Sequence, residues 1–427
     1  MAAAEPKRAG QDPSRSDATS RPGPRAALRA LGPGLVSGAS DTDPTTVAAI
    51  AVIGATTVFG LAWLALLIAP ALIVIQVIAV RLGVLGGTDL PTAARDRFRP
   101  AVQHAIAGSI VAVTVLTLAA DLSAGAASIG ILAGVSTGWL VAPLAAVIVL
   151  LLVLGTSSGI LRVLKYLTLA LLAYAVSAVL TDVSWAQVLH HSFVPSFSLT
   201  HDYIAGALAL VGTTLTSYVF VWQTVQLAEQ RRTPDRLGVT ETDAAFGIVF
   251  TVVIIWFILV ATGATLGVHH ESVQTAQDAA RALAPLAGSA ASTVFGLGLL
   301  ASALIAVPVL MGTASYVVGA EFGWRRGLSE PVSRAPRFYA ALVVTTAAAV
   351  LVTFVHVSAI RLLFYASIAG GIGTPVALGC LLVLARDRTV MRGRPIGVAL
   401  GTAGWVVTAT MALMSGLYVL DQLGAFR

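Results

Sequence analysis

The chain has 427 residues, of which 57% are hydrophobic and only 11% charged, against roughly 25% charged residues in an ordinary soluble domain. This composition excludes a soluble globular protein and indicates a polytopic membrane protein. The formal charge of +6 does not indicate a nucleic-acid partner, because the basic residues form short clusters between apolar runs. The single cysteine, Cys380, excludes an intrachain disulfide and disfavours redox chemistry.

The first residues differ in composition from the rest of the chain. Residues 1–31 are rich in Ala, Pro, Arg and Ser and contain no apolar core. They therefore predict a disordered tail rather than a secretory signal peptide. We expect residues 32–427 to form one transmembrane domain.

Eleven apolar runs approach or meet the length of about 20 residues that a helix needs to cross a hydrocarbon core. They are Leu35–Val58, Leu61–Val80, Ile106–Ile131, Trp139–Gly155, Ile160–Leu180, Tyr203–Leu227, Phe246–Val268, Val294–Val318, Tyr339–Val355, Leu362–Ala385 and Ile396–Leu420. The pattern predicts an all-α polytopic membrane protein with 11 transmembrane helices.

The basic residues predict the orientation of these spans. If the amino terminus is inside, every Lys and Arg except Arg281, Arg361 and Arg427 lies in an inner segment. This is the expected distribution, because basic residues accumulate in cytoplasmic loops. We therefore predict a multi-pass protein of the cell membrane, with a cytoplasmic amino terminus and an extracellular carboxyl terminus.

The first run contains a stretch that is poorly suited to lipid, Ser40-Asp41-Thr42-Asp43-Pro44-Thr45-Thr46. A charged side chain at bilayer depth costs roughly 2.5–3.5 kcal/mol even on insertion scales, so such residues usually face a polar cavity on a transport pathway. Of the 20 acidic residues, only Asp41, Asp43 and Asp121 lie well inside predicted spans, without a comparably deep Lys or Arg. These carboxylates predict a cavity that attracts cations.

A second polar interruption, Gly212-Thr213-Thr214-Leu215-Thr216-Ser217-Tyr218, lies in the sixth run, five spans after the first. Paired interruptions in two halves are typical of transporters built from inverted repeats, which bind substrate between broken helices. We therefore expect broken helices 1 and 6, an inverted 5+5 repeat at about 32–181 and 202–386, and an extra helix at about 396–420.

Each interruption presents oxygen donors at i, i+3 spacing, namely Asp43 with Thr46 and Thr213 with Thr216. A carboxylate, hydroxyls and freed carbonyls suit hard cations such as Mg²⁺, Ca²⁺ or Mn²⁺. We predict these four residues as metal ligands. Residues predicted to act behind the ligands, or on the water of a hydrated ion, are Asp41, Ser217, Tyr218 and Gln223.

Simpler structural roles remain open for the same residues. Asp43-Pro44 is also typical of a helix start, with an acidic cap and proline in the first turn. Threonines in spans often bond only to the carbonyl four residues earlier, and Gln223 is equally suited to a bond between helices. Asp121 is either a candidate proton site or a buried acid bonded to a neighbouring helix. No H-E-x-x-H sequence occurs, and we predict no enzymatic activity.

At these residues the chain resembles the Nramp (natural resistance-associated macrophage protein) family of divalent metal transporters, which has the leucine-transporter type fold. The resemblance runs from about Gly34 to about Ala385. The matching stretches are Asp43-Pro44-Thr45-Thr46 for the family's Asp-Pro-Gly-Asn, Asp121-Leu122-Ser123-Ala124 for its Asp-Leu-Ala-Glu, Thr213–Tyr218 for its Ala-x-x-Met-Pro-His, and two stretches of the eighth helix, 296–302 and 312–316.

Four departures from the family pattern bear on metal binding or on the proton route. Thr46 replaces asparagine, Thr216 the metal-binding methionine, Tyr218 the histidine and Ala124 the glutamate. Loss of the methionine implies a weaker preference for softer transition metals. Loss of the histidine and glutamate leaves Asp121 as the only matched acid of the family's proton route. The pattern is closer to the Nramp-related magnesium transporters, which also lack the methionine and continue into Trp-Gln.

The resemblance implies import of divalent metal cations by alternating access, with Mg²⁺ favoured, Mn²⁺ accepted and no obligatory proton coupling. A proton-coupled Mn²⁺/Fe²⁺ symporter, with the proton on Asp121, is the alternative. An amino-acid transporter of the same fold is a more distant one. The metal is then a substrate, no cofactor is expected, and the expected partners of a monomer are the metal ion and the lipid bilayer, without nucleic acid.

Overall fold

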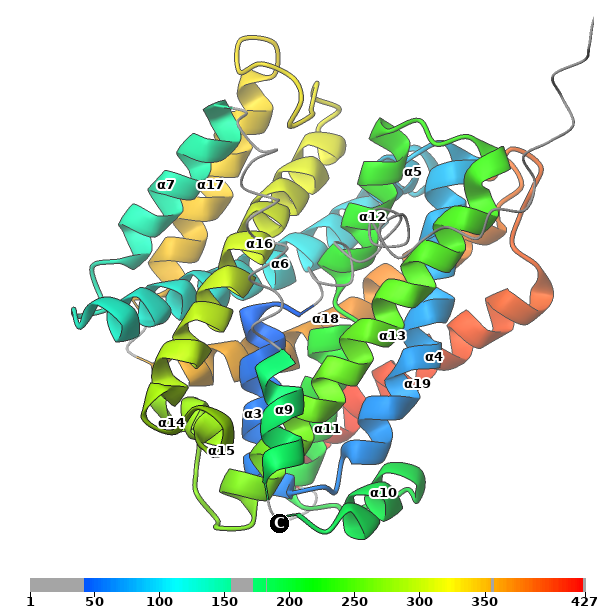
Figure 1. Ribbon diagram of the computed structural model, residues 1–427. Helices are drawn as coiled ribbons and strands as arrows, with labels where there is room; N and C mark the ends of the chain where they lie inside the picture. The colour runs from blue at the N-terminus through cyan, green and yellow to red at the C-terminus, as the bar shows by residue number, and fades with distance from the viewer. Residues whose placement is uncertain (1–41, 155–171, 182, 355–356, 425–427) are drawn as a thin grey trace, which may run out of the picture.

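The structure is a computed structural model that describes residues 42–154, 172–181, 183–354 and 357–424 (Figure 1). The predicted tail, Asp41 and most of the fifth predicted span lie outside these ranges. Every regular element within the ranges is a helix. The predicted all-α class is therefore confirmed, while the division into two repeats stays a prediction.

Seven helices of the described residues are long and apolar enough to cross a membrane. They are α4 (Ala62–Arg81) with η1 (Leu82–Gly86), α6 (Pro100–Ala133), α11 (His201–Thr214) with α12 (Ser217–Glu229), η3 (Pro234–Arg236) with α13 (Leu237–Thr262) and η4 (Gly263–Gly267), η6 (Gly288–Ala290) with α16 (Ala291–Glu321), α18 (Ala359–Arg386) and α19 (Val398–Gln422). Three shorter apolar helices are α3 (Pro44–Thr57), α7 (Val141–Leu154) and α17 (Pro336–Val352). Together with α9 (Leu172–Leu180), these helices cover at least part of each predicted span.

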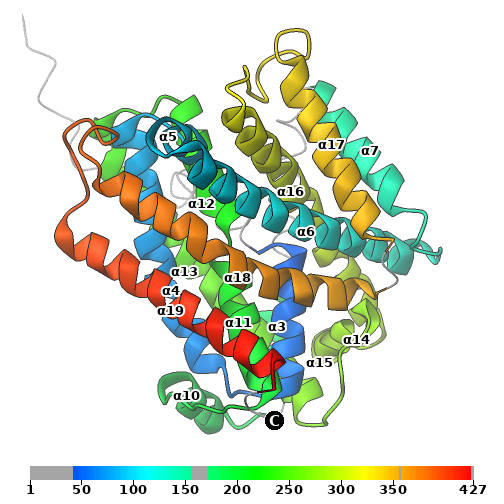
Figure 2. The same ribbon diagram turned by 180° about the vertical axis from the view of Figure 1, so that it is seen from behind.

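Short helices occupy several connections that the apolar runs did not predict. They are α5 (Leu90–Arg97), α10 (Trp185–Phe193), α14 (Ala276–Ala280), η5 (Arg281–Leu283) and α15 (Ala284–Ala287). Figures 1 and 2 show α5 at one end of the molecule, beside α12, and α10 at the opposite end. In the predicted orientation, the end that carries α5 is cytoplasmic.

The helix α3 lies inside the bundle, where it packs against α11, α13 and α18. Figure 2 shows α6 and α18 crossing on the same side of α3. The beginning of α3 is therefore enclosed by helices that are distant from it in the sequence.

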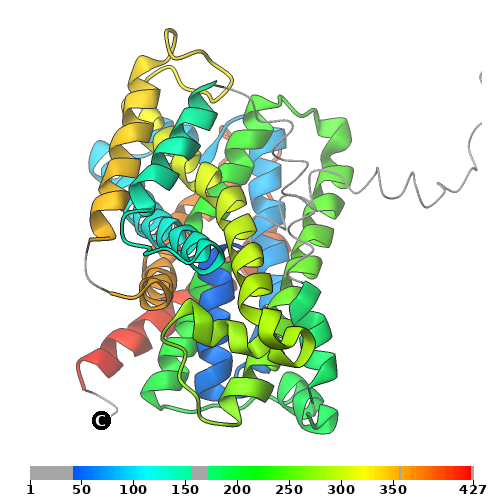
Figure 3. The ribbon, with the colours of Figure 1, turned by 60° about the vertical axis from the view of Figure 1, so that its left-hand side comes forward.

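Figure 3 shows α7 and α17 side by side at one edge of the molecule, and the two helices are in contact.

The predicted interruption of the sixth run is confirmed. The helix α11 ends at Thr214, and α12 begins at Ser217 after Thr216, whose backbone is extended (φ −72°, ψ 145°). Just before this break, a Cβ atom added at Gly212 would overlap the Ser367 carbonyl oxygen and lie 2.8 Å from Gly371 Cα. The glycine thus lets α11 and α18 meet backbone to backbone, as small residues do in membrane helix pairs.

Candidate functional site at the two helix breaks

Asp43 connects the start of α3, which we call the first break, to the second break between α11 and α12. The residues before Thr42 lie outside the described ranges, so the broken form of the first helix stays a prediction. It is 1% exposed and caps α3, because its Oδ1 atom accepts a hydrogen bond of 2.6 Å from the Thr46 backbone N–H. Its Oδ2 atom accepts a bond of 2.7 Å from the Tyr218 hydroxyl in the first turn of α12. The capping role considered from the sequence is present. It leaves the carboxylate with further lone pairs, since an ionised carboxylate offers about four acceptor positions.

The predicted ligands Thr46 and Thr213 also meet. Their Oγ1 atoms are 3.0 Å apart, and either hydroxyl can be the donor. Thr216 stands at the cap position of α12, and its Oγ1 atom is buried without a hydrogen-bond partner among the described residues. The structure therefore brings hydroxyl oxygens of both breaks to one enclosed region.

Two neighbouring helices hold the backbone of the breaks. Ser302 of α16 donates a hydrogen bond to the Thr42 carbonyl, and the Ser217 backbone N–H donates to Thr374 Oγ1 of α18 at 3.1 Å. The side-chain hydroxyls of Thr42 and Ser217 are buried and have no partner within the described part of the chain. Since buried polar atoms are nearly always hydrogen-bonded, these oxygens are candidates for binding a ligand or its water.

Asp121 of α6 lies beside the first break. Its Oδ1 atom accepts hydrogen bonds from the Thr45 backbone N–H at 3.1 Å and from Thr45 Oγ1 at 2.6 Å. The residue is fully buried, and its Oδ2 atom has no partner among the described residues. Both bonds lie at the amino-terminal end of α3, where unpaired N–H groups favour negative charge.

The other residues predicted behind the ligands lie in different places. Tyr218 and Ser217 are in the first turn of α12 and contact the site directly. Gln223 is buried two turns further along the same helix, at 8% exposure. Asp41 lies outside the described residues, so its role stays a prediction.

Sequence reasoning missed Ser302 and Thr374, and it did not predict that Thr45, a residue of the first polar interruption, bonds to Asp121. Ser302 and Thr374 are small hydroxyl residues in long apolar helices, where such side chains usually bond only to their own helix. Ser302 ends one of the eighth-helix stretches that carry the family resemblance, which was the only available signal. Thr374 offered no signal beyond its polarity.

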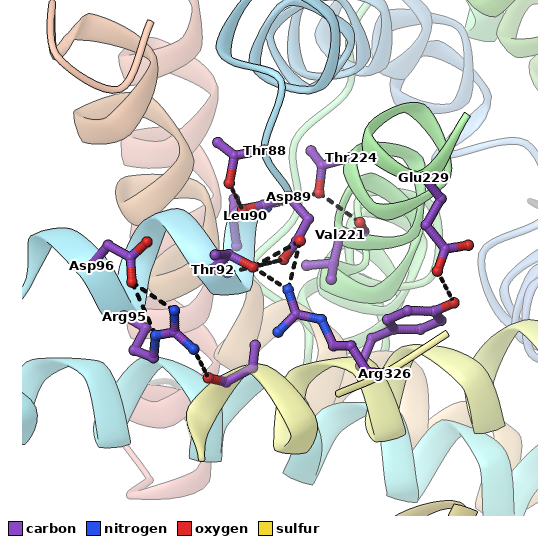
Figure 4. Close-up of polar contacts among 12 residues, drawn as sticks. Thr88, Asp89, Leu90, Thr92, Arg95, Asp96, Val221, Thr224, Glu229 and Arg326 are labelled. Atoms are coloured by element: carbon purple, nitrogen blue, oxygen red, sulfur yellow. Dashed lines mark hydrogen bonds and ion pairs between the residues drawn. The ribbon is translucent and has the colours of Figure 1, made fainter. Parts of the chain in front are cut away.

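A polar network joins several helices at the end of the molecule that carries α5 (Figure 4). Asp89 caps α5 through the Thr92 backbone N–H, and its Oδ2 atom pairs with Arg326 Nη2 at 2.8 Å. Arg326 also donates to the Thr92 hydroxyl. Because Arg326 follows α16 in the sequence, this contact joins the end of α16 to α5.

The same network includes α12. The Leu90 backbone N–H donates to Thr224 Oγ1 at 3.0 Å, and the Tyr316 hydroxyl donates to Glu229. We call the set Asp89, Thr92, Thr224, Glu229, Tyr316 and Arg326 the α5–α12 junction. The junction ties the second half of the broken helix to α5 and α16.

The donor set at the breaks limits what they can bind. The four predicted ligands Asp43, Thr46, Thr213 and Thr216 are at most 4% exposed. Among the described residues, no group of three or more His, Cys, Asp or Glu side chains is placed to hold a metal. An ion at the breaks must therefore take most of its ligands from hydroxyls, carbonyls or its own water, which suits a hard cation.

The family model that matches this chain and its similar curated proteins indicate the same family of metal transporters. The family model described as natural resistance-associated macrophage protein-like, Nramp, matches residues 34–421. The divalent metal cation transporter MntH of Ralstonia nicotianae is 27% identical, over 93% of this chain and 91% of its own length. The protein of the same name from Deinococcus radiodurans is 28% identical, over 94% and 92% respectively.

Solved structures agree on the fold. The manganese transporter of Eremococcus coleocola, in complex with an aromatic bis-isothiourea substituted compound, aligns with a TM-score of 0.71 at 16% identity, covering 94% of this chain and 88% of that one. MhsT in complex with L-phenylalanine aligns with a TM-score of 0.59 at 14% identity, covering 91% and 97%. These likenesses confirm the predicted leucine-transporter type of fold.

Proposed function

This chain belongs to the natural resistance-associated macrophage protein-like family, and on that premise we propose that it imports divalent metal cations by alternating access, with Mg²⁺ favoured over Mn²⁺. Members of this family are transporters and not enzymes, so the metal is a substrate. The chain is accordingly a divalent metal transporter of the membrane. The cytoplasmic position of its amino terminus remains part of the proposal.

The observation that carries the ion preference is the oxygen chemistry between the breaks. Asp43 supplies the negative charge, and the hydroxyls of Thr46 and Thr213, 3.0 Å apart, line the same region. Thr216 stands at the position of the metal-binding methionine in the Nramp pattern. The threonine therefore offers a hard oxygen where that pattern has a soft sulfur ligand. Mg²⁺ gives up water reluctantly and is usually bound by one or two carboxylates plus several waters. One carboxylate ringed by hydroxyls supports an ion of this kind.

The membrane potential is sufficient to drive uptake. An inside-negative potential of 100 mV contributes about 2.3 kcal/mol per charge, or about 4.6 kcal/mol for a divalent ion. Import therefore needs no proton gradient. Tyr218 and Ala124 stand where the resembling family has a histidine and a glutamate of its proton route, which further supports uptake without obligatory proton coupling.

A proton-coupled Mn²⁺/Fe²⁺ symporter is the second candidate. The buried Asp121 favours it, because one of its carboxylate oxygens has no partner among the described residues. The relatives named as MntH are divalent metal cation transporters, and the similar Eremococcus protein is a manganese transporter. Both candidates use the same fold and the same carboxylate in the first break.

Uptake into liposomes tests the proposal. We expect the intact protein to carry Mg²⁺ and Mn²⁺ inward and to prefer Mg²⁺ when Mg²⁺, Ca²⁺, Mn²⁺ and Cd²⁺ are compared. Asp43→Asn keeps the shape of the side chain but removes its charge, so uptake should fall at least about tenfold. Asp202→Asn removes an exposed acid in the first turn of α11, eleven residues before Thr213, and serves as the matched control.

Three outcomes would contradict the proposal in different ways. Uptake that is unaffected by Asp43→Asn removes the assigned site. Acidification of the liposome interior that accompanies metal entry and is lost in Asp121→Asn establishes the symporter. Competition by amino acids but not by metals revives the more distant alternative, an amino-acid transporter of this fold.

A further inference from the structure

A second polar site lies at the end of the bundle that carries α5. It is a cavity of about 580 Å³, whose walls come from η1, the end of α12, the turn into α13 and the loop between α18 and α19. Figures 1 and 2 show these segments gathered at that end. Its lining includes four arginines, Arg231, Arg232, Arg392 and Arg394, and no acidic residue. We call it the arginine pocket.

The arginines of the pocket are not neutralised by the described part of the chain. None of the four forms a salt bridge there, although Arg232 Nε donates to the amide oxygen of Gln230 at 2.9 Å. Asp235 lies two residues beyond the lining residue Thr233 and accepts a hydrogen bond from its hydroxyl. The pocket therefore keeps a net positive charge.

The backbone holds two of these arginines in an unusual conformation. Arg231 and Arg392 have positive φ angles of 47° and 49°, a left-handed region that disfavours residues other than glycine. Both stand at turns that glycine would form without strain. Non-glycine residues kept in this region cluster at functional sites, which makes both arginines candidates for a functional role.

The guanidinium of Arg392 is also packed against the opposite wall. A Cβ atom added at Gly87 would lie 2.9 Å from Nη2 and 3.0 Å from Cζ of Arg392. Gly87, at the end of η1, therefore allows the side chain to reach across from the α18–α19 loop. The Arg392 guanidinium thus lies against η1, while Arg231, Arg392 and Arg394 remain accessible to solvent and to a ligand.

We propose that the arginine pocket binds a phosphate group. A guanidinium binds phosphate oxygens through parallel N–H donors, and several of them can share one phosphate. The pocket lies near the ends of α4, α12 and α18 and the start of α13, and basic side chains near the ends of membrane helices attract anionic lipid headgroups. The phosphate comes from an anionic phospholipid headgroup or from a soluble phosphate, and the chemistry is the same for both.

Occupancy of the pocket would have a mechanical consequence. A bound phosphate would connect α12, the second half of the broken helix, to η1 and to the α18–α19 loop. The ligand would thus stabilise the arrangement in which these segments lie together. This inference does not depend on which metal ion is transported.

Binding measurements on the intact purified protein test the proposal. Inorganic phosphate and short-chain phosphatidylglycerol are titrated separately, with binding followed by mass spectrometry of the intact complex. The key variant is Arg231→Gly with Arg392→Gly, because glycine accepts the left-handed backbone and the fold is retained. The control variant, Arg236→Gln with Arg388→Gln, removes the same number of charges from the same two segments outside the pocket.

We expect the Kd for phosphate or phosphatidylglycerol to rise at least about tenfold in the pocket variant, because that variant loses charged hydrogen bonds to the ligand. In the control variant the Kd should change less than about twofold. Gly87→Ala, which keeps all the arginines but displaces Arg392, should also weaken binding. Binding of inorganic phosphate identifies a soluble source, and binding of phosphatidylglycerol alone identifies a lipid. Absence of binding to the wild-type protein, or equal losses in pocket and control variants, would overturn the proposal.

Discussion

The hydroxyl of Tyr218 donates a 2.7 Å hydrogen bond to Asp43 Oδ2, so a residue of the second break holds the carboxylate of the first. Both residues are only 1% exposed. An ion that enters between the breaks must share or replace this bond. Tyr218 therefore competes with the ion for Asp43, which weakens ion binding and assists ion release.

Replacing Tyr218 with phenylalanine tests this competition. The ring remains in its buried position, but Asp43 loses the bond from the Tyr218 hydroxyl, and the ion no longer competes with that bond. A hydrogen bond of this kind contributes about 0.5–1.5 kcal/mol net, so we expect the KM for the transported ion to fall about two- to tenfold, with slower turnover. Uptake kinetics in liposomes measure both quantities. A KM that rises, as expected for Asp43→Asn, would show that the tyrosine positions the carboxylate for binding.

Asp121 and Thr45 form a second contact whose energetic contribution is testable. Thr45→Val keeps the side-chain shape but removes the 2.6 Å hydroxyl bond to Asp121 Oδ1. A buried carboxylate that loses a donor is destabilised by about 1–3 kcal/mol, and the midpoint of thermal unfolding in detergent should fall accordingly.

The matched control for this prediction is Thr56→Val. Thr56 lies on the same helix, but its hydroxyl bonds only to the Val52 and Ile53 carbonyls of its own helix at the surface. We expect a change within about 0.5 kcal/mol. Equal effects of the two substitutions would mean that the contact to Asp121 adds nothing to stability.

The sequence predicted the features that depend on one segment at a time. Apolar length located the spans, and the polar interruption at Gly212–Tyr218 located the break between α11 and α12. The pair Asp43-Pro44 predicted the start of α3. These signals are local because a helix in lipid must satisfy its own backbone.

The sequence could not predict which helices supply the partners of the site. The bonds from Ser302 to the Thr42 carbonyl, and from Ser217 to Thr374, join residues 260 and 157 positions apart. Their residue types occur throughout the apolar helices, so composition does not distinguish them. The short helix α5 was also missed, because its eight residues contain no long apolar run.

Thr216 allows a test of ion selectivity. Its hydroxyl is buried without a described partner, at the position that corresponds to the methionine of the resembling family. Thr216→Met introduces a soft sulfur ligand, so we expect uptake of Cd²⁺ relative to Mg²⁺ to rise about tenfold or more. Competition between the two ions in liposomes measures the ratio. Thr216→Ser keeps the oxygen and should leave the ratio unchanged, and a ratio that is unchanged in both variants would remove Thr216 from the site.

The α5–α12 junction predicts how the protein opens toward the end that carries α5. The pair between Asp89 and Arg326 is nearly buried, with side-chain exposures of 14% and 16%. Domain rocking during alternating access must separate such contacts at the end that opens. Weakening the junction should therefore favour the state that is open at this end.

A labelling experiment measures this shift. Cys380 is the only cysteine, so Cys380→Ala with Ala93→Cys places a single thiol on the buried face of α5, where Ala93 is 4% exposed. Arg326→Ala breaks the pair with Asp89 but leaves the cap of α5 in place, and a loss of about 1 kcal/mol should raise the labelling rate about fivefold. The control is Arg97→Ala, which breaks a 2.6 Å pair between α5 and Asp387, because the Arg97 side chain is 56% exposed and exposed pairs contribute little. Labelling of Arg326→Ala at the wild-type rate would show that the junction does not hold these helices together.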